Sequence, residues 1–424
     1  MRTSRDETRG VAAMVWMAAL LMAAAGWGLI AAPAAEAEDL AFDSRTIAED
    51  GLHWWARALG DVNDNGLLDI FLQHDNAHGG WLGWFETGED AASWTRHIIA
   101  EESPDGTPFA GGVLTAGDIN GNGHVDVIGL AHPGEWTDAG ASTAIYWYEN
   151  PMPDGDPVED EWQAHAIGEA PAFIKDVKVT DFTGDGAMDV VAITFEEERF
   201  LVYRQDAPDE WTQVQDFQIH NLHEGLHVGD ITGNGLTDVA TNGYWVENPG
   251  GDLTDEWTVR SIDEKWHNQD GDWSRNATKI YCRDITGDGQ AEVFIAHSER
   301  AGYPVSWYRA DDPREGPWEE HVIIESMPAV HTLHVADFDG NGDHDVLAGV
   351  NRGRAQALGE DEFPVIVFRD QGDGMSWEEF LVTNEGIYNG QVGDLQGNGL
   401  PDIFRMASHD SEHFEVLVNQ TPTP

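Results

Sequence analysis

A nine-residue acidic pattern, D-x-x-x-[DN]-G-x-x-[DE], begins at residues 61, 118, 181, 230, 284, 337 and 394. It places oxygen-bearing side chains at positions 1, 3, 5 and 9, and a glycine at position 6, where the backbone must turn. Oxygen ligands in a tight turn suit a hard cation such as Ca²⁺, so the pattern predicts calcium sites with a structural role. The predicted ligands are Asp61, Asn63, Asn65, Asp69, Asp118, Asn120, Asn122, Asp126, Asp181, Asp185, Asp189, Asp230, Asn234, Asp238, Asp284, Asp288, Glu292, Asp337, Asp339, Asn341, Asp345, Asp394, Asn398 and Asp402.

The seven copies do not offer equal ligands. Position 3 is Asn or Asp in the copies that begin at 61, 118 and 337, but Thr183, Thr232, Thr286 or Gln396 in the others. These are weaker ligands, which leaves metal binding open in those copies. A second interpretation applies to every copy. Asp and Asn also cap turns by accepting hydrogen bonds from backbone N–H groups, while glycine supplies a positive φ.

A polar row lies on the segment that leads into each acidic pattern. Alternation with mainly apolar neighbours predicts a strand with one polar face. The chain's only lysines, Lys175, Lys178, Lys265 and Lys279, all lie on or just before these segments. The residues three positions before the first Asp of each copy are Ala58, Thr115, Lys178, His227, Tyr281, His334 and Gln391.

These side chains define the candidate chemistry. We expect His227, Tyr281 and His334 to be the proton carriers of any reaction. Cationic and imidazole groups near the same strand ends favour an anionic ligand, and the predicted ligand-binding residues are Lys178, His223, Arg275, Lys279, His297, Arg300 and His331. A transition metal held by His223 with His227, or by His331 with His334, is a weaker alternative. His331 and His334, at i and i+3, would face opposite sides of a strand, and His223 and His227, at i and i+4, would lie about 13 Å apart. Neither spacing suits two ligands of one metal ion.

The repeat predicts the elements that position these residues. An apolar run follows each acidic pattern, then come an aromatic strand and, in six units, a strand that opens with tryptophan. Four strands in each unit, with no helical pattern, predict an all-β, seven-bladed propeller over residues 38–424. The seventh unit lacks its fourth strand, and residues 40–50 resemble one. We therefore expect the N-terminal strand to complete the last blade, which leaves no open sheet edge. Because the first strand of a propeller blade is innermost, the polar row should line the central channel.

The repeat resembles the FG-GAP/VCBS family, whose propellers include the integrin α-subunit head and those of many exported bacterial proteins. The seven in-phase acidic patterns are the basis of this likeness, which covers almost all of residues 40–420. The resemblance implies a closed propeller whose acidic loops bind calcium. The sequence WYENP at 147–151 and the element W-x-x-H-x-I are also similar to propellers of carbohydrate-active enzymes, including the aldos-2-ulose dehydratase type.

Composition limits the partners. A formal charge of −56 argues against nucleic acid and anionic membrane surfaces as partners. Arg2, Arg5 and Arg9 precede a long apolar run that ends in the small-residue motif AEA at 35–37, which predicts a signal peptide over residues 1–37. Retention of this run as an uncleaved anchor is the alternative. After cleavage, we expect a monomer that is secreted, periplasmic or extracellular.

Three functions are compatible with these features. The first is a binding module for an acidic carbohydrate or an extracellular protein at the cationic channel mouth. The second is a carbohydrate-active lyase or dehydratase that uses a His or Tyr base there. The third is an adhesion or protein-interaction module. No contiguous catalytic motif is present, although a propeller assembles its sites from several blades.

Overall fold

Strands are the main regular elements of the computed structural model, which describes residues 39–48, 56–73, 80–134, 140–195, 197–372, 374–409, 411 and 413–422. The predicted signal peptide and its alternative, an uncleaved anchor, lie outside these residues. In the part of the chain that is described, the strands form seven four-stranded sheets whose neighbouring strands are all antiparallel. No helix of the described residues has both the length and the apolar character needed to cross a bilayer.

Six of the sheets, blades 1 to 6, are each built from four consecutive strands. Blade 1 contains β2 (Ala56–Gly60), β3 (Asp69–Gln73), β4 (Leu82–Thr87) and β5 (Trp94–Ala100), and blade 2 contains β6 (Ala116–Gly117), β7 (Asp126–Ala131), β8 (Thr143–Glu149) and β9 (Gln163–Ala170). Blade 3 contains β10 (Ile174–Thr180), β11 (Asp189–Thr194), β12 (Arg199–Ala207) and β13 (Glu210–Gln218), and blade 4 contains β14 (Leu226–Gly229), β15 (Asp238–Thr241), β16 (Tyr244–Glu247) and β17 (Thr258–Ser261). Blade 5 contains β18 (Thr278–Arg283), β19 (Glu292–His297), β20 (Val305–Arg309) and β21 (Glu319–Ile324), and blade 6 contains β22 (Val330–Ala336), β23 (Asp345–Val350), β24 (Val365–Asp370) and β25 (Trp377–Thr383).

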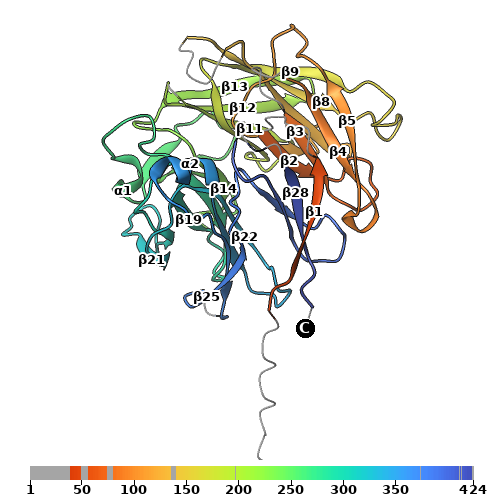
Figure 1. Ribbon diagram of the computed structural model, residues 1–424. Coiled ribbons are helices and arrows are strands. Elements are labelled where there is room, and N and C mark those ends of the chain that lie inside the picture. The colour runs from red at the N-terminus through yellow and green to blue at the C-terminus, as the bar shows by residue number, and fades with distance from the viewer. Residues whose placement is uncertain are drawn as a thin grey trace, which may run out of the picture. The chain divides into compact units, whose positions relative to one another are not determined.

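Blade 7 joins the two ends of the described chain. Its inner strands are β26 (Gln391–Gly393), β27 (Asp402–Arg405) and β28 (Phe414–Asn419), and its outer strand is β1 (Phe42–Ala48). Strand β1 pairs antiparallel with β28, with Phe42 opposite Asn419, and Figure 1 shows red β1 beside blue β28. The predicted closure by the N-terminal strand is confirmed.

The first strands of successive blades contact one another around the axis of the ring. Such contacts join β2 to β6, β10 to β14, β14 to β18, β18 to β22, β22 to β26 and β26 back to β2. The first strand of each blade is therefore innermost, as expected from the sequence. The seven-bladed propeller is confirmed.

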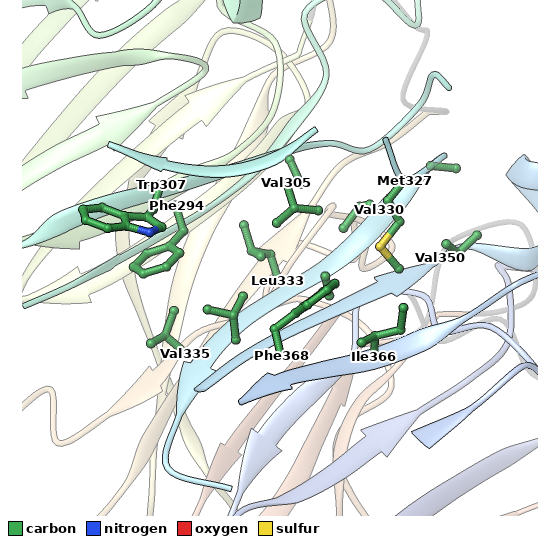
Figure 2. Packing of buried hydrophobic residues seen from close by; sticks show 14 of the residues in the cluster. Phe294, Val305, Trp307, Met327, Val330, Leu333, Val335, Val350, Ile366 and Phe368 are labelled. Atoms are coloured by element: carbon green, nitrogen blue, oxygen red, sulfur yellow. The ribbon is translucent and has the colours of Figure 1, made fainter. Parts of the chain in front are cut away.

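The hydrophobic cores lie between adjacent blades. Figure 2 shows the cluster between blades 5 and 6, where Phe294 and Trp307 pack against Leu333 and Val335. Phe294 and Trp307 are fully buried. Truncation of side chains of this size costs about 3–5 kcal/mol, so the packing of one blade on the next is a main source of stability.

Short helices are the main difference from the sequence expectation, which contained none. They are the 3₁₀ turn η2 (Glu89–Ala91), α1 (Glu264–His267) and α2 (Arg352–Leu358). Asn351 caps α2 by accepting hydrogen bonds from the N–H groups of Gly353 and Arg354, and Gly359 ends the helix with a φ of 93°. Seven residues do not give a clear helical period, which explains why the sequence pattern did not reveal α2.

The acidic patterns form the turns between the first and second strands of every blade. Their position-6 glycines have φ values between 85° (Gly235) and 97° (Gly342), a region that side chains with a Cβ avoid. In the first turn, both carboxylate oxygens of Asp61 accept backbone N–H groups, from Asn65 at 3.0 Å and Gly66 at 2.8 Å. The capping role is therefore present in the structure.

The last residue of the pattern joins three segments of its blade. Asp126 is fully buried and accepts the N–H of Ile119 at 2.9 Å and the N–H of Asn150 at 2.8 Å. One carboxylate thus ties the acidic turn and the end of the third strand to the start of the second strand. Asp69, Asp189, Asp345 and Asp402 make the same pair of bonds. Asp238 accepts instead from the N–H groups of Thr232 and Asn248, and Glu292 accepts from the N–H of Ile285 and the hydroxyl of Thr286.

Amide side chains at the ends of third strands link neighbouring blades. Asn150 Nδ2 donates to the carbonyl of Val62 at 2.8 Å, and Asn248 Nδ2 donates to that of Phe182 at 2.8 Å. The links from Gln205 to Ile119 and from Asn419 to Phe338 are equivalent. Each bond runs from one blade to the turn of the preceding blade, so the acidic turns also hold the ring together.

We expect Asp126→Asn to lower the free energy of unfolding by about 1–3 kcal/mol at about pH 8, where the carboxylate is ionised. An amide directs its own N–H₂ group at one of the two backbone N–H groups that Asp126 satisfies. Urea unfolding followed by tryptophan fluorescence measures the effect. Asp154→Asn changes an exposed carboxylate of the same blade and is the control. Equal unfolding midpoints for the two variants would contradict the role of Asp126.

Candidate functional site

The polar row of the innermost strands surrounds a central channel. A cavity of about 100 Å³, the channel cavity, is lined by Lys178, His227, Tyr281, His334 and Gln391 of this row, and by Lys279 and His331. The predicted orientation of the row is confirmed for these five positions. The structure therefore brings together all three candidate proton carriers and three of the seven predicted ligand-binding residues.

The candidate proton carriers are neighbours across blades 4, 5 and 6, and His227 stacks on Tyr281. The His227 and Tyr281 ring centroids lie 4.2 Å apart, and those of Tyr281 and His334 lie 5.5 Å apart. Burial, together with the positive charge of Lys178, lowers the pKa of both histidines, that of His334 to about 4. Both imidazoles are therefore neutral at pH 7. Their catalytic roles stay predictions.

A larger cavity of about 310 Å³, the mouth pocket, lies at the opposite ends of the inner strands from the acidic turns. Its walls are largely aromatic and include Phe173, Phe195, Trp273 and Tyr388. Trp273 is 43% exposed, while Phe195 and Tyr388 are buried. Aromatic walls with a few polar groups are typical of small-molecule sites.

One buried ion pair of the mouth pocket connects blades 3 and 4. Lys175, on β10, places Nζ 2.7 Å from Oε2 of Glu224, which precedes β14. Ser298 Oγ donates to the other oxygen of Glu224, which is 1% exposed. Burial disfavours the charged form of Lys175 and of Glu224, but the attraction between the two opposite charges outweighs this effect. The pKa of Lys175 is raised, and the pKa of Glu224 is held well below its usual range.

A second buried cluster connects blades 5 and 6. Glu299, just after β19, accepts from His331 Nε2 at 2.7 Å and lies 2.9 Å from Arg354 Nε on α2. Arg354 also covers the Trp273 ring, with its guanidinium carbon 4.9 Å from the ring centroid. His331 lines the channel cavity and Glu299 lines the mouth pocket, so the two cavities adjoin at this pair.

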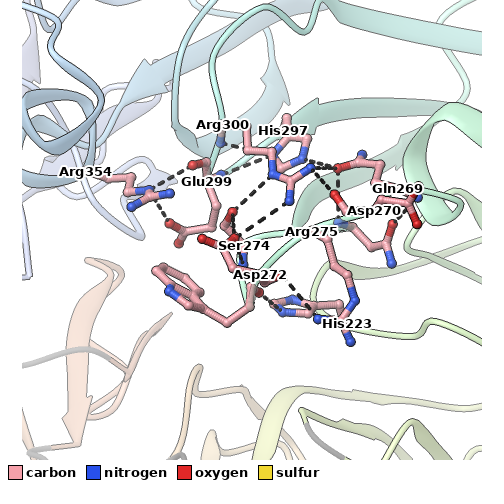
Figure 3. A network of polar contacts seen from close by, with 12 residues as sticks. His223, Gln269, Asp270, Asp272, Ser274, Arg275, His297, Glu299, Arg300 and Arg354 are labelled. Carbon is pink, nitrogen blue, oxygen red and sulfur yellow. Dashed lines mark hydrogen bonds and ion pairs between the residues drawn. The ribbon is translucent and has the colours of Figure 1, made fainter.

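The loop that presents Trp273 is held by polar contacts (Figure 3). Arg300 donates to Ser274 Oγ at 3.1 Å and to Gln269 Oε1 at 3.2 Å, and His297 Nε2 lies 2.9 Å from the same Gln269 oxygen. Neither Arg300 nor His297 lines the mouth pocket. These two predicted ligand-binding residues therefore hold the loop that carries Trp273.

Two further predicted residues, His223 and Arg275, flank Trp273. His223 lines the mouth pocket, and its Nε2 lies 2.6 Å from the carbonyl of Trp273. Arg275 lines a neighbouring cavity of about 150 Å³ and bonds to the carbonyl of Asp272 at 3.2 Å. Burial lowers the pKa of His223, so this imidazole is neutral at pH 7.

The mouth pocket also contains residues that are not among the predicted site residues. They are Lys175, Glu224, Trp273, Glu299, Arg354 and Tyr388. Their placement just before first strands or just after second strands was a usable signal, because those segments meet at one end of a propeller. The pairing of Lys175 with Glu224 depends on the packing of two blades and has no sequence signature.

The acidic turns differ as candidate metal sites. Carboxylate oxygens lie within 4.8 Å of one another in two of the described turns, in Asp284, Asp288 and Glu292 and in Asp337, Asp339 and Asp345. Three carboxylates at that distance repel unless a proton or a cation is shared, so these two turns fit a calcium ion best. The carboxylate at position 9 already accepts the hydrogen bonds described above. A metal ion would therefore share this carboxylate with those donors.

Comparisons with known proteins agree with the fold. The family described as "FG-GAP-like repeat" matches residues 181–241 and 284–348. No curated protein matches the chain. A chain in the crystal structure of BBS1N in complex with ARL6DN, soaked with mercury, is similar with a TM-score of 0.51 at 10% identity, over 90% of this chain and 97% of that one. The WD40 domain of Toxoplasma gondii coronin is similar with a TM-score of 0.54 at 9% identity, over 91% and 87%. At such identities the likeness shows the fold alone.

The buried position-9 carboxylates predict a specific pH dependence of stability. Burial raises the pKa of Asp69 and Asp345 to about 7, and that of Asp126, Asp189, Asp238 and Asp402 to about 6, from an ordinary value of 3.8. Between these values the folded protein retains protons that the unfolded chain has lost. The contribution of these carboxyl groups to stability is therefore largest at the acid end of this range and decreases as the pH rises through 6 to 7.

We thus expect the melting temperature, measured in a metal chelator, to decrease between about pH 6.5 and pH 8, above the range in which buried histidines of lowered pKa such as His334 add stability as the pH rises. The Asp345→Asn variant should show a shallower decrease, since it lacks one of the titrating groups. Differential scanning fluorimetry at constant ionic strength checks both. A melting temperature that increases over this range would contradict the assignment.

Proposed function

Because the chain is a seven-bladed β-propeller with FG-GAP-like repeats, we propose that it is an exported binding module that holds a carbohydrate with an anionic group in the mouth pocket. The observation on which the proposal depends is the combination of aromatic walls with fixed charges in one cavity of about 310 Å³. Aromatic faces stack on the apolar face of a sugar ring, and carboxylates accept hydrogen bonds from its hydroxyl groups.

The charges of the mouth pocket are held in place before any ligand arrives. Lys175 is fixed by Glu224, and Arg354 is fixed by Glu299 and by the ring of Trp273. Preorganised groups lose little conformational entropy on binding, which favours affinity. Glu224 and Glu299 balance the charges of the two cations, so an acidic group on the ligand would be recognised through N–H donors of Lys175 and Arg354 and not through a net positive charge.

Binding of an extracellular protein at the same mouth, or an adhesive role, is the competing proposal for this module. A cavity that recedes between aromatic side chains suits a compact ligand better than a flat protein surface.

An enzyme is the second candidate, because Glu299 and His331 form a carboxylate–imidazole pair. His331 Nε2 contacts Glu299, while buried Nδ1 has no hydrogen-bond partner among the described residues. Such a pair can remove the proton next to the carboxylate of a uronate. The C–H electrons would then form the C=C bond as the neighbouring C–O bond breaks, and the leaving oxygen would take a proton from a Tyr or from water.

Calcium in the acidic turns is also part of the proposal. The convergence of three carboxylates in the turns that begin at 284 and 337 supports it. The ion would neutralise that charge and stiffen the ring, with no part in chemistry. A transition metal at Glu224, Glu299 and His331 fits less well, although their ligand atoms also lie within 4.8 Å, because Lys175 and Arg354 already neutralise the carboxylates.

For the carbohydrate site, Trp273→Ala should weaken binding of oligogalacturonate at least tenfold, or about 1.4 kcal/mol, by isothermal titration calorimetry. Trp211→Ala, on outer strand β13, is the matched control and should bind like the unaltered protein. Equal loss in both variants, or no binding of any acidic or neutral oligosaccharide by the unaltered protein, would overturn the proposal.

The same oligosaccharides distinguish the enzyme from the module. The lyase candidate requires ultraviolet absorbance from an unsaturated product, and His331→Gln should abolish this absorbance. Binding without product would contradict the lyase and leave the binding module intact.

For the acidic turns, we expect a chelator to lower the melting temperature and added Ca²⁺ to restore it. An Asp284→Asn, Asp337→Asn double variant should lose most of this response, because it removes the position-1 ligand of the two best turns. Asp154→Asn should respond like the unaltered protein. A melting temperature that does not change with chelator would contradict bound calcium.

A further inference from the structure

Two of the four lysines line the channel cavity and have no partner among the residues that the structure describes. Lys175 pairs with Glu224, and Lys265 pairs with Glu320 on the outside of the ring. Lys178 and Lys279 line the channel cavity, and neither forms an ion pair or hydrogen bond with any residue that the structure describes. In a chain with 78 acidic residues, lysines without a carboxylate partner are unexpected.

The nearest carboxylates are already engaged. Asp176 is 6% exposed and accepts the N–H of Gly225 at 2.9 Å. Glu224 uses one oxygen for Lys175 and the other for Ser298. Burial lowers the pKa of Lys178, and the adjacent positive charge of Lys279 lowers it further although Asp176 opposes this. The two ammonium groups are close enough to repel each other.

The cavity offers little space. His227 Nδ1 lies 3.0 Å from the carbonyl oxygen of Val228 and 3.2 Å from the backbone nitrogen of Cys282, so these contacts hold the ring against the backbone. The ring of His227 lines the cavity with the lysines. A volume of about 100 Å³ admits a small oxyanion and excludes a sugar ring with its hydroxyl groups.

We propose that the channel cavity is an oxyanion site in which Lys178 and Lys279 hold a carboxylate, sulfate or phosphate group. The anion would relieve the repulsion between the two ammonium groups. It is either a free inorganic ion or the acidic group of a ligand whose remainder lies in the adjoining mouth pocket. The site does not depend on carbohydrate binding.

The test measures the melting temperature of the full chain against sodium sulfate, with sodium nitrate added to keep ionic strength and sodium constant. The unaltered protein should show a saturable rise with sulfate. Lys178→Met and Lys279→Met should each weaken the apparent sulfate affinity at least tenfold. Lys265→Met, the control at a paired lysine, should respond like the unaltered protein.

A second readout separates a lost site from a damaged fold. Without sulfate, Lys178→Met should melt no lower than the unaltered protein, because the substitution removes one of two repelling charges and keeps most of the side-chain volume. A lower melting temperature in the absence of sulfate would mean that Lys178 stabilises the fold through a partner, and it would overturn the proposal.

Galacturonate and galactose identify the source of the anion. A response to sulfate that galacturonate does not displace supports a free ion. A response to galacturonate, absent with galactose and lost in Lys178→Met, supports the carboxylate of a sugar ligand. If neither anion acts on the unaltered protein, or if Lys178→Met and Lys265→Met respond alike, the channel is not an anion site. Trp273→Ala should leave the sulfate response unchanged, so failure of the carbohydrate proposal is recognised separately.

Discussion

The ring depends on one buried carboxylate in each blade. In six blades an Asp at the start of the second strand accepts one N–H from the acidic turn and one from the end of the third strand, as Asp126 does for Ile119 and Asn150. The two donors reach different oxygens of the carboxylate, Oδ2 and Oδ1, whereas an amide or a hydroxyl offers a single acceptor oxygen. The geometry of the turn follows from this bridge. The acidic turns also provide backbone carbonyls that accept hydrogen bonds from amide side chains of the next blade, as the carbonyl of Phe182 accepts from Asn248.

The architecture was predictable because it rests on local and repeated patterns. The spacing of the acidic patterns predicted seven blades, and the missing fourth strand of the last unit predicted the pairing of β1 with β28. Alternation of side chains on the first strands placed Lys178 and His334 in the channel. What was not predictable depends on distant parts of the chain. Lys175 meets Glu224 from another blade, and Arg354 reaches Glu299 only because α2 forms.

The same reasoning explains the mixed outcome for the histidines. His331 was expected near the channel and lies there, bonded to Glu299. His297 was expected to bind a ligand, but it is fully buried and holds Gln269 instead. Sequence position indicates which end of the ring a residue occupies. Whether its side chain faces the cavity or a neighbouring loop depends on tertiary packing that a periodic pattern does not record.

The pairing of β1 with β28 affects the order in which the strands can pair during synthesis. Strand β1 is the earliest described strand to be synthesised, and its only sheet partner is the last. Through nearly the whole of translation β1 therefore has no native neighbour, and β28 in turn presents an open edge until β1 docks. Unpaired edges of this kind bind other chains readily. Docking of β1 covers the edge of β28, so slow docking gives other chains more time to bind that edge before the last blade is complete.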